Sequence, residues 1–137
     1  MVASQKRANM LIADSSRTPW ACRLADSLKP WPVDIHWSRS DVEAIELLSG
    51  TGVHLAVIDD NLPRAGGLDL LRRMRLLGRD FPTLLVCDEA DQRLLQAALE
   101  LNVYSVVSAD PNLDLLTPTV FKVFNHFYKF DWNYGSN

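Results

Sequence analysis

The stretch Val57–Leu68, VIDDNLPRAGGL, decides how the rest of the chain is read. The stretch begins with the last two residues of an apolar run, His54–Ile58, and two aspartates follow that run. A turn rich in proline and glycine follows, and then apolar residues at helical spacing predict a helix over Gly67–Leu77. A short apolar strand that leads through a tight turn into a helix is the repeating unit of a parallel α/β sheet.

The same unit recurs on both sides of this stretch. Four further apolar runs predict strands over Met10–Ala13, Val33–Trp37, Thr83–Cys87 and Tyr104–Val107. Capping residues, prolines and glycines predict the remaining helices, which open at Thr18-Pro19, Ser40, Asp91 and Thr117-Pro118. Strand and helix units with right-handed crossovers predict a flavodoxin-like, doubly wound (βα)5 domain, with a five-stranded parallel sheet in the order 2-1-3-4-5. We expect this domain to span residues 1–130, and residues 131–137 to form an aromatic C-terminal tail.

Composition excludes several other classes of protein. The 137 residues are 47% hydrophobic and 23% charged, as in an ordinary globular domain, and the net charge of -3 gives no attraction to nucleic acid or to an anionic membrane. Cys22 and Cys87 have no metal-ligand spacing, and a chain of this size needs no disulfide framework. The N-terminal apolar run is too short for a signal peptide or a membrane span, so we expect a cytoplasmic location.

Acidic residues follow two of the predicted strands. Asp14-Ser15 comes after the first strand, and Asp59-Asp60 after the third. In a doubly wound sheet these strand ends are neighbours at the point where the winding direction reverses, so the carboxylates should gather there. Clustered carboxylates suit a hard divalent cation such as Mg²⁺. Aspartates at strand ends also commonly cap turns and helices, and the pattern alone leaves both readings open.

The segment D-x-x-L-P-x-x-x-G at Asp59–Gly67 resembles the response-regulator receiver family of chemotaxis-receiver type. The resemblance extends from Leu11 to Val103. It implies that Asp59 is the phosphoacceptor, and that Asp14, Asp59 and the main-chain carbonyl of Asn61 hold Mg²⁺. It also implies protein partners, a histidine kinase or a downstream effector, and no enzymatic activity of the domain itself.

The chain departs from the family pattern at the expected phosphoryl pocket. The departures are Ser15 in place of a second acidic residue, Cys87 in place of Thr or Ser, Asp88 in place of a small residue, and Ser108 or Ala109 in place of a lysine. The missing metal ligand, hydroxyl and cation are each worth on the order of 1 to 3 kcal/mol in a partly buried site. We therefore expect Mg²⁺ binding to be weak and phosphorylation impaired, unless Asp60 or Asp88 replaces the missing ligand.

Three functions follow from this pattern. The first is an atypical receiver domain in two-component (phosphorelay) signal transduction that acts mainly as a protein-interaction module. The second is a working, Mg²⁺-dependent phosphoacceptor at Asp59. The third is a small-molecule binder of flavin-like type on the same fold, although no phosphate-binding loop follows the first strand.

The C-terminal part of the chain is richer in aromatic residues than one covered helix face requires. We expect some of them to form an interaction surface, for which the candidates are Tyr104, Phe121, Phe124 and Tyr128. Receiver domains commonly dimerise through helix four, strand five and helix five. The resemblance therefore implies a homodimer or a partner contact at that surface.

Overall fold

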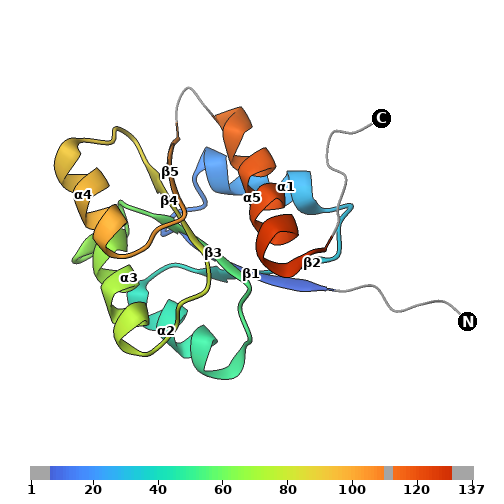
Figure 1. Cartoon of the computed structure of the whole chain (residues 1–137), viewed down its shortest axis with the longest axis horizontal. Helices are drawn as coiled ribbons and strands as arrows, with labels where there is room; N and C mark the ends of the chain where they lie inside the picture. The colour runs from blue at the N-terminus through green and yellow to red at the C-terminus, as the bar shows by residue number, and fades with distance from the viewer. Residues whose placement is uncertain (1–6, 110–112, 131–137) are drawn as a thin grey trace, which may run out of the picture.

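A parallel sheet with helices on both faces forms the core of the chain (Figure 1). The computed structural model describes residues 7–109 and 113–130. Its strands are β1 (Ala8–Ala13), β2 (Val33–Ser38), β3 (Leu55–Asp59), β4 (Thr83–Cys87) and β5 (Ser105–Ser108). They pair in the order β2-β1-β3-β4-β5, which confirms the predicted topology. The predicted tail, residues 131–137, lies outside the described residues, so the domain boundaries remain a prediction.

The strands agree with the apolar runs to within a few residues. The bounds of β4 are those predicted, whereas β1 starts at Ala8 and β5 is shifted by one residue to Ser105–Ser108. Hydrogen-bonded neighbours in the sheet, rather than the apolar pattern, set these ends. The residues of β1, β3 and β4 are almost all buried, as expected for strands that helices cover on both faces of the sheet.

Local capping residues set the ends of several helices. The helices are α1 (Pro19–Leu28), α2 (Asp41–Gly50), α3 (Gly66–Leu76), α4 (Gln92–Glu100) and α5 (Leu113–Tyr128). Ser40 Oγ accepts the amide of Glu43 at the start of α2, and the Asp91 side chain accepts the amide of Leu94 at the start of α4. Gly78 (φ 78°) and Asn102 (φ 58°) follow α3 and α4 in the left-handed conformation that commonly ends a helix.

Helix α5 begins earlier than predicted. The Thr117-Pro118 pair was expected to open it, but the helix starts at Leu113 and Pro118 lies inside it. Leu116 and Val120, on either side of the proline, are buried in the core (2% and 0% exposed). This packing holds the helix together through a residue that donates no amide hydrogen bond, a tertiary effect that the capping pattern does not report.

The two faces of the sheet carry separate hydrophobic cores. Figure 1 shows α1 and α5 on one face of the sheet and α2, α3 and α4 on the other. Met10 and Ile12 of β1 belong to the core formed with α1 and α5, whereas Leu11 and Ala13 belong to the core formed with the other three helices. Within the described residues, no helix combines the length and the apolar character needed to cross a membrane.

Two residues of the predicted interaction surface belong to the core instead. Phe121 and Phe124 are 3% and 0% exposed and pack with the core residues of α1 and the sheet. Trp31 packs edge-on against Phe121, with ring centroids 4.8 Å apart. The prediction that Phe121 and Phe124 form a binding surface is therefore wrong, because the amphipathic face of α5 that carries them is the face turned to the sheet.

Candidate functional site

The sheet brings Asp14 and Asp59 together. Ala13 of β1 is paired in register with Ile58 of β3, so the next residue of each chain segment reaches the same edge of the sheet. Both carboxylic acids are buried, with 2% of Asp14 and 7% of Asp59 exposed. The prediction that carboxylates gather at the strand ends holds for this pair.

Asp14 uses only one of its two oxygens. Its Oδ2 accepts the amide of Thr18 at 2.7 Å and the Thr18 hydroxyl at 3.2 Å. The sequence pattern predicted that Thr18 would cap α1. Its hydroxyl instead donates to Asp14 and makes no capping hydrogen bond to the helix. The other oxygen, Oδ1, is buried and has no hydrogen-bond partner. A buried oxygen without a donor is costly, and it marks a place where a cation or a proton would be stabilised.

Asp59 is held by two donors. The amide of Asn61 donates to Oδ1 at 2.8 Å, and the indole nitrogen of Trp20 donates to Oδ2 at 3.3 Å. Burial raises the pKa of the Asp59 carboxyl, and the neighbouring Asp14 carboxyl raises it further, while the bonds from Asn61 and Trp20 lower it. Asp59 is thus a carboxylate whose charge is poorly solvated.

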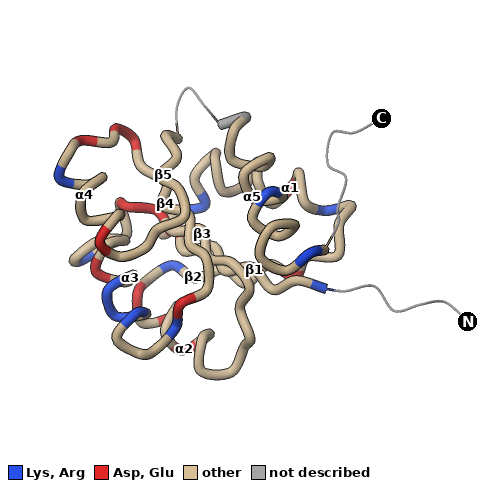
Figure 2. Tube along the Cα trace, viewed as in Figure 1, with Lys and Arg blue, Asp and Glu red and all other residues tan. Residues whose placement is uncertain are grey.

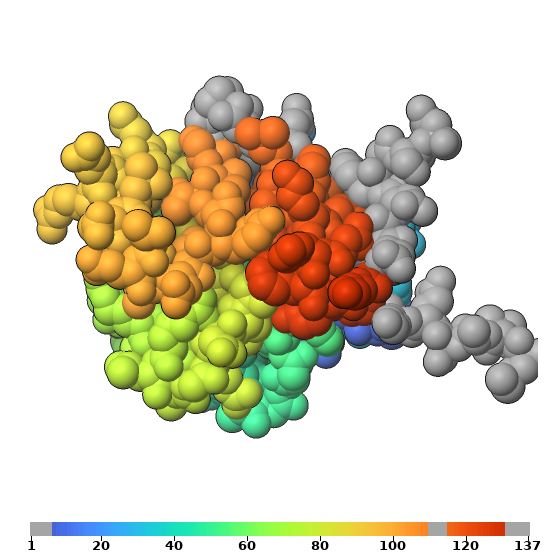
Figure 3. Space-filling view, viewed as in Figure 1, coloured from blue at the N-terminus to red at the C-terminus, as the bar shows by residue number. Residues whose placement is uncertain are grey.

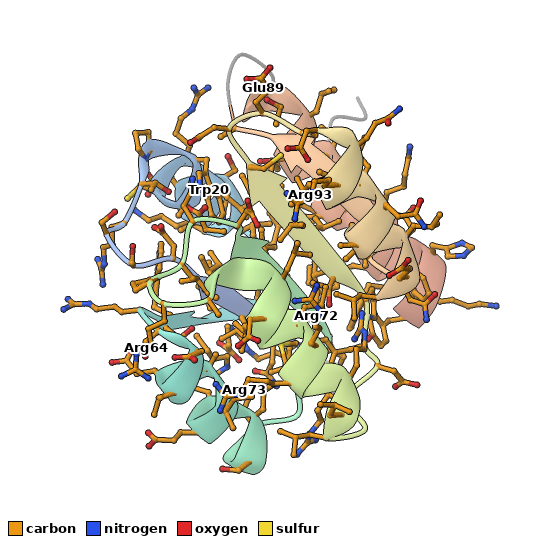
Figure 4. All side chains as sticks on the ribbon, turned by 90° about the vertical axis from the view of Figure 1, so that its left-hand side faces the viewer. Trp20, Arg64, Arg72, Arg73, Glu89 and Arg93 are labelled. Carbon is orange, nitrogen blue, oxygen red and sulfur yellow. The ribbon has the colours of Figure 1, made fainter. Side chains whose placement is uncertain are left out.

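A cavity of about 460 Å³ opens beside Asp59. Polar and apolar side chains both line it: Ser15, Ser16, Thr18, Pro19, Trp20, Asp59, Asn61, Val86, Cys87, Asp88 and Ala109. Figure 4 shows Trp20 beside the start of α1, at the ends of the strands. The cavity therefore lies where doubly wound sheets bind their ligands.

Cys87 lies in the cavity wall but offers it no strong donor. Its Sγ lies 3.9 Å from the main-chain carbonyl of Val107, which takes the weak S–H donor. Burial, and then the negative charges of Asp60 and Asp88, raise the pKa of the Cys87 thiol. These surroundings disfavour the thiolate, which is the reactive form of a cysteine.

The loop after β4 is tied to the loop after β3 by an acid. Asp88 Oδ2 accepts the side-chain amide of Asn61 at 3.0 Å, which places a carboxylate at the rim of the cavity. Ser108 turns its hydroxyl to the main-chain carbonyl of Asp88, and Ala109 lines the cavity. The sequence has no lysine or arginine between Arg93 and Lys122, so the end of β5 contributes no cation.

Asp60 lies apart from this cavity. It lines a second, smaller cavity of about 290 Å³ between α3 and α4, together with Glu89 and Asp91 and the arginines Arg72 and Arg93. Both arginines are labelled in Figure 4. Asp60 is therefore poorly placed to replace the missing metal ligand. Among the described residues, no three His, Cys, Asp or Glu side chains form a metal-binding group.

A close backbone approach positions Asp59. A Cβ on Gly67 would lie 2.5 Å from the main-chain oxygen of Asp59 and 2.9 Å from the Ile58 side chain. The preceding Gly66 has φ 85°, a conformation open to glycine but strained for other residues. The two glycines of the quoted stretch thus let α3 start directly against the end of β3.

Trp20 is the site residue that sequence reasoning missed. Its spacing with Leu24 and Leu28 is that of the buried face of a helix, and Trp20 is 4% exposed. Periodicity reports the buried face of a helix but not the hydrogen bond that a buried indole makes. A tryptophan in the first turn after an Asp-containing loop was the available signal.

Known receiver domains have the same fold. The signal receiver domain of an HD domain-containing protein from Pseudomonas fluorescens Pf-5 is 25% identical, with a TM-score of 0.78 over 88% of this chain and 97% of that one. The signal receiver domain of a LuxO repressor protein, described as putative, from Vibrio parahaemolyticus is 19% identical, with a TM-score of 0.78 over 88% of this chain and 92% of that one. The chain is a response-regulator receiver-like domain. No family model matches its sequence.

One curated relative is similar to this chain in sequence. The sensor histidine kinase RcsC of Salmonella typhimurium is 30% identical to this receiver-like domain over 97 residues, which are 71% of this chain. The chain spans about a tenth of the length of that kinase (10%). The similarity therefore concerns a small part of a much longer protein.

The other two predicted surface residues have different surroundings. Tyr104 is 37% exposed and packs edge-on against Phe127, with ring centroids 5.7 Å apart. Tyr128 is half-buried, and its hydroxyl donates to the main-chain carbonyl of His54 at 2.5 Å. Tyr104 thus lies at the surface of β5 and α5, whereas Tyr128 ties the end of α5 to the sheet.

Proposed function

We propose that this chain is an atypical receiver domain that acts mainly by presenting a surface to a protein partner, with impaired phosphoryl transfer to Asp59. In this proposal the domain is cytoplasmic and has no enzymatic activity of its own. Its partner is a histidine kinase or a downstream effector of a two-component pathway.

The surroundings of Asp59 support this proposal most directly. A phosphoryl group on Asp59 adds a dianion, which needs donors and cations within a few ångströms. Here Trp20 already donates to one Asp59 oxygen, and Asp88 adds a negative charge at the rim of the same cavity. The described residues that line the cavity include no lysine or arginine.

A working phosphoacceptor at Asp59 is the second candidate. The observation in its favour is the buried, unpartnered Oδ1 of Asp14. Asp14, Asp59 and the main-chain carbonyl of Asn61 would be ligands of Mg²⁺ there, and the Ser15 hydroxyl would be an uncharged fourth ligand. Magnesium would offset negative charge on the transferring oxygens. Two carboxylates where the family has three predict a weaker site.

A flavin-like phosphate ligand finds less support. The Thr18 amide, which would be a donor to a phosphate at the start of α1, already donates to Asp14 Oδ2. The negative charge of Asp14 would also repel an incoming phosphate.

Phosphorylation is tested with two reagents. In the first experiment the protein is titrated with beryllofluoride and Mg²⁺, and the amide NMR signals of residues around Asp59 report binding. In the second it is incubated with acetyl phosphate and Mg²⁺, and intact mass spectrometry measures any phosphoryl adduct. We expect no saturable change below millimolar beryllofluoride and no stable phosphoryl adduct. Asp59→Asn is the site variant, and Asp34→Asn is the matched control, since Asp34 is an exposed acid paired with Arg7. A stoichiometric adduct lost in Asp59→Asn but kept in Asp34→Asn would establish the second candidate instead.

We also propose that the surface of α4, β5 and α5 is the contact for a second copy or a partner. Exposed apolar side chains gather there: Leu95 (46% exposed), Leu99 (71%), Tyr104 (37%) and Phe127 (48%). In Figure 3 these elements form one continuous band, from yellow through orange to red. Apolar groups of this kind on a surface are typical of an interface.

Light scattering after size-exclusion chromatography tests the homodimer. We expect a dimer at high micromolar concentration, converted to monomer by Leu99→Glu. Leu76→Glu is the control, because Leu76 is 86% exposed on α3, outside this surface. A wild-type monomer throughout would overturn the homodimer and leave a different protein as the partner.

A further inference from the structure

We propose that the cavity beside Asp59 binds a small organic cation, in which an amidinium, guanidinium or ammonium group is carried by a compact apolar body. The proposal rests on the proposed function, because it needs a pocket that does not hold a phosphoryl group. It goes further by giving this pocket a ligand of its own.

The charges around the cavity point to a cation. Asp59 and Asp88 both line it, and they are linked by Asn61, which donates to Asp59 Oδ1 through its amide and to Asp88 Oδ2 through its side chain. The arginine of the neighbouring loop, Arg17, stacks over the Trp37 ring at 4.9 Å from the centroid and does not line the cavity. The carboxylates thus face the cavity without a cation from any described lining residue. In Figure 2 the acidic positions gather in the loops after β3 and β4, whereas the basic positions follow α3.

The Asp14 carboxyl adds negative charge next to Asp59, although Asp14 itself does not line the cavity. Oδ1 of Asp14 has no hydrogen-bond partner although the residue is only 2% exposed. The carboxyl of Asp14 interacts with that of Asp59, which lines the cavity. Asp59 itself receives one hydrogen bond on each oxygen, so acceptor positions remain open on both. A forked donor such as an amidinium supplies the missing positive charge and several N–H groups at once.

The apolar walls favour an organic cation over a bare metal ion. Four of the lining residues are apolar or mostly apolar: Pro19, Trp20, Val86 and Ala109. A volume of about 460 Å³ lies in the range of small-molecule pockets, which combine mostly apolar walls with a few placed polar groups. An aromatic ring near a bound cation adds further attraction. A metal ion would use only the oxygens and leave these walls without a contact.

Benzamidinium is the probe for this test, because it joins a flat ring to a forked cation. Binding is followed by two-dimensional NMR of ¹⁵N-labelled protein, with the indole N–H of Trp20 and the amide of Asn61 as reporters. Benzamide, which has the same shape and no charge, is the matched ligand control. We expect saturable shifts at Trp20 and Asn61 with benzamidinium, and binding of benzamide at least about tenfold weaker, the factor that one charge-assisted hydrogen bond provides.

Variants test the acids. Asp88→Asn removes an exposed charge and should leave the fold intact, and Asp59→Asn removes the buried one; each should weaken benzamidinium binding about tenfold or more. Asp34→Asn removes an acid that does not line the cavity and should leave binding unchanged.

The outcomes separate this inference from the proposed function. Equal binding of benzamide and benzamidinium, no saturable shift at Trp20, or binding unchanged in both Asp59→Asn and Asp88→Asn would overturn the cation site. A stable phosphoryl adduct at Asp59 after acetyl phosphate would overturn the proposed function instead. A protein that takes no phosphoryl group and binds no benzamidinium would contradict only the inference made here.

Discussion

The indole nitrogen of Trp20 donates a hydrogen bond to Oδ2 of Asp59 over 3.3 Å. A side chain from the first turn of α1 therefore engages one oxygen of the residue that the receiver pattern marks as phosphoacceptor. Asn61 engages the other oxygen through its amide. The carboxylate is consequently fixed in place by neutral donors, a state that is compatible with a permanent structural role or with ligand binding.

Replacing Trp20 tests how much this hydrogen bond contributes to the stability of the domain and to the pKa of Asp59. Trp20→Phe keeps an aromatic ring in the buried position and removes the donor, and it should destabilise the domain by about 1 kcal/mol beyond the change in packing. The pKa of Asp59 should rise further, because the indole bond lowers it. Carbon-detected NMR titration of the Asp59 carboxyl measures the pKa. An unchanged or lower pKa in Trp20→Phe would show that the bond is absent in solution.

Asp59→Asn should stabilise the domain at neutral pH. Burial raises the pKa of Asp59 above its ordinary value of 3.8, so the folded state binds the proton more tightly than the unfolded state does. The wild-type stability therefore falls as pH rises from 3.8 to the folded pKa, and the whole cost is present above it. Removing the buried charge should stabilise the domain at pH 7, by less than the full cost of burial because the new side-chain amide can accept from only one of the two donors, Asn61 and Trp20.

Urea unfolding of wild type and Asp59→Asn across the pH range measures this difference. The gain should shrink toward acid pH, where wild-type Asp59 is itself protonated. Asp34→Asn, which removes an exposed acid, is the control and should show no such gain. A loss of stability in Asp59→Asn at pH 7 would contradict the burial argument.

Gly67→Ala should disrupt the start of α3 against the site. The added Cβ would lie 2.5 Å from the Asp59 main-chain oxygen, a distance that forces the backbone of β3 or α3 to move. We expect a loss of about 2 kcal/mol or more, as for overpacking of a dense core. Gly50→Ala is the matched control, because a Cβ there meets nothing within 4 Å, and it should be neutral or stabilising by about 0.5 kcal/mol. Thermal unfolding compares the two, and equal effects would refute the close approach.

Arg75 joins the ends of α3 and α4. Its guanidinium donates to the main-chain carbonyls of Leu101 at 3.0 Å, Arg79 at 2.9 Å and Phe81 at 3.2 Å. Lysine cannot reproduce this fork, so Arg75→Lys should cost about 2 kcal/mol of unfolding free energy. The control is Arg72→Lys on the same helix, where the side chain is exposed, with an expected change within about 0.5 kcal/mol. Chemical denaturation measures both, and a neutral Arg75→Lys would mean that these bonds add nothing.

His54 should make the stability sensitive to mild acid. Its Nδ1 accepts the amide of Asn9 at 3.0 Å, and burial lowers the pKa of the ring below its ordinary value of 6.5. The unfolded state then takes up the proton first, so stability falls as pH drops below 6.5 and stops falling below the folded pKa. His54→Asn, which keeps an acceptor that does not titrate, should flatten this part of the curve. The exposed His126→Gln should leave it unchanged, and a pH profile of the melting temperature distinguishes them.

Sequence alone determined the architecture of this protein. The alternation of short apolar runs with capped helical segments specified a parallel sheet, and β4 lies where the apolar run predicted it. Gly78 and Asn102 end α3 and α4 in the left-handed conformation, a local requirement that glycine and asparagine meet through their own chemistry. The spacing around Asp59 also gave the family, since motif residues close in sequence keep their geometry.

Tertiary structure alone decided what surrounds Asp59 and which aromatic residues reach the surface. Trp20 is far from Asp59 in sequence, and only the docking of α1 on the sheet aims its indole at that carboxylate. Phe121 and Phe124 share an aromatic-rich helix with Phe127, yet only Phe127 is exposed, because the side of α5 that meets the sheet is fixed by packing. Periodicity defines a buried face, but the partner across that face depends on contacts between segments distant in sequence, which no local pattern encodes.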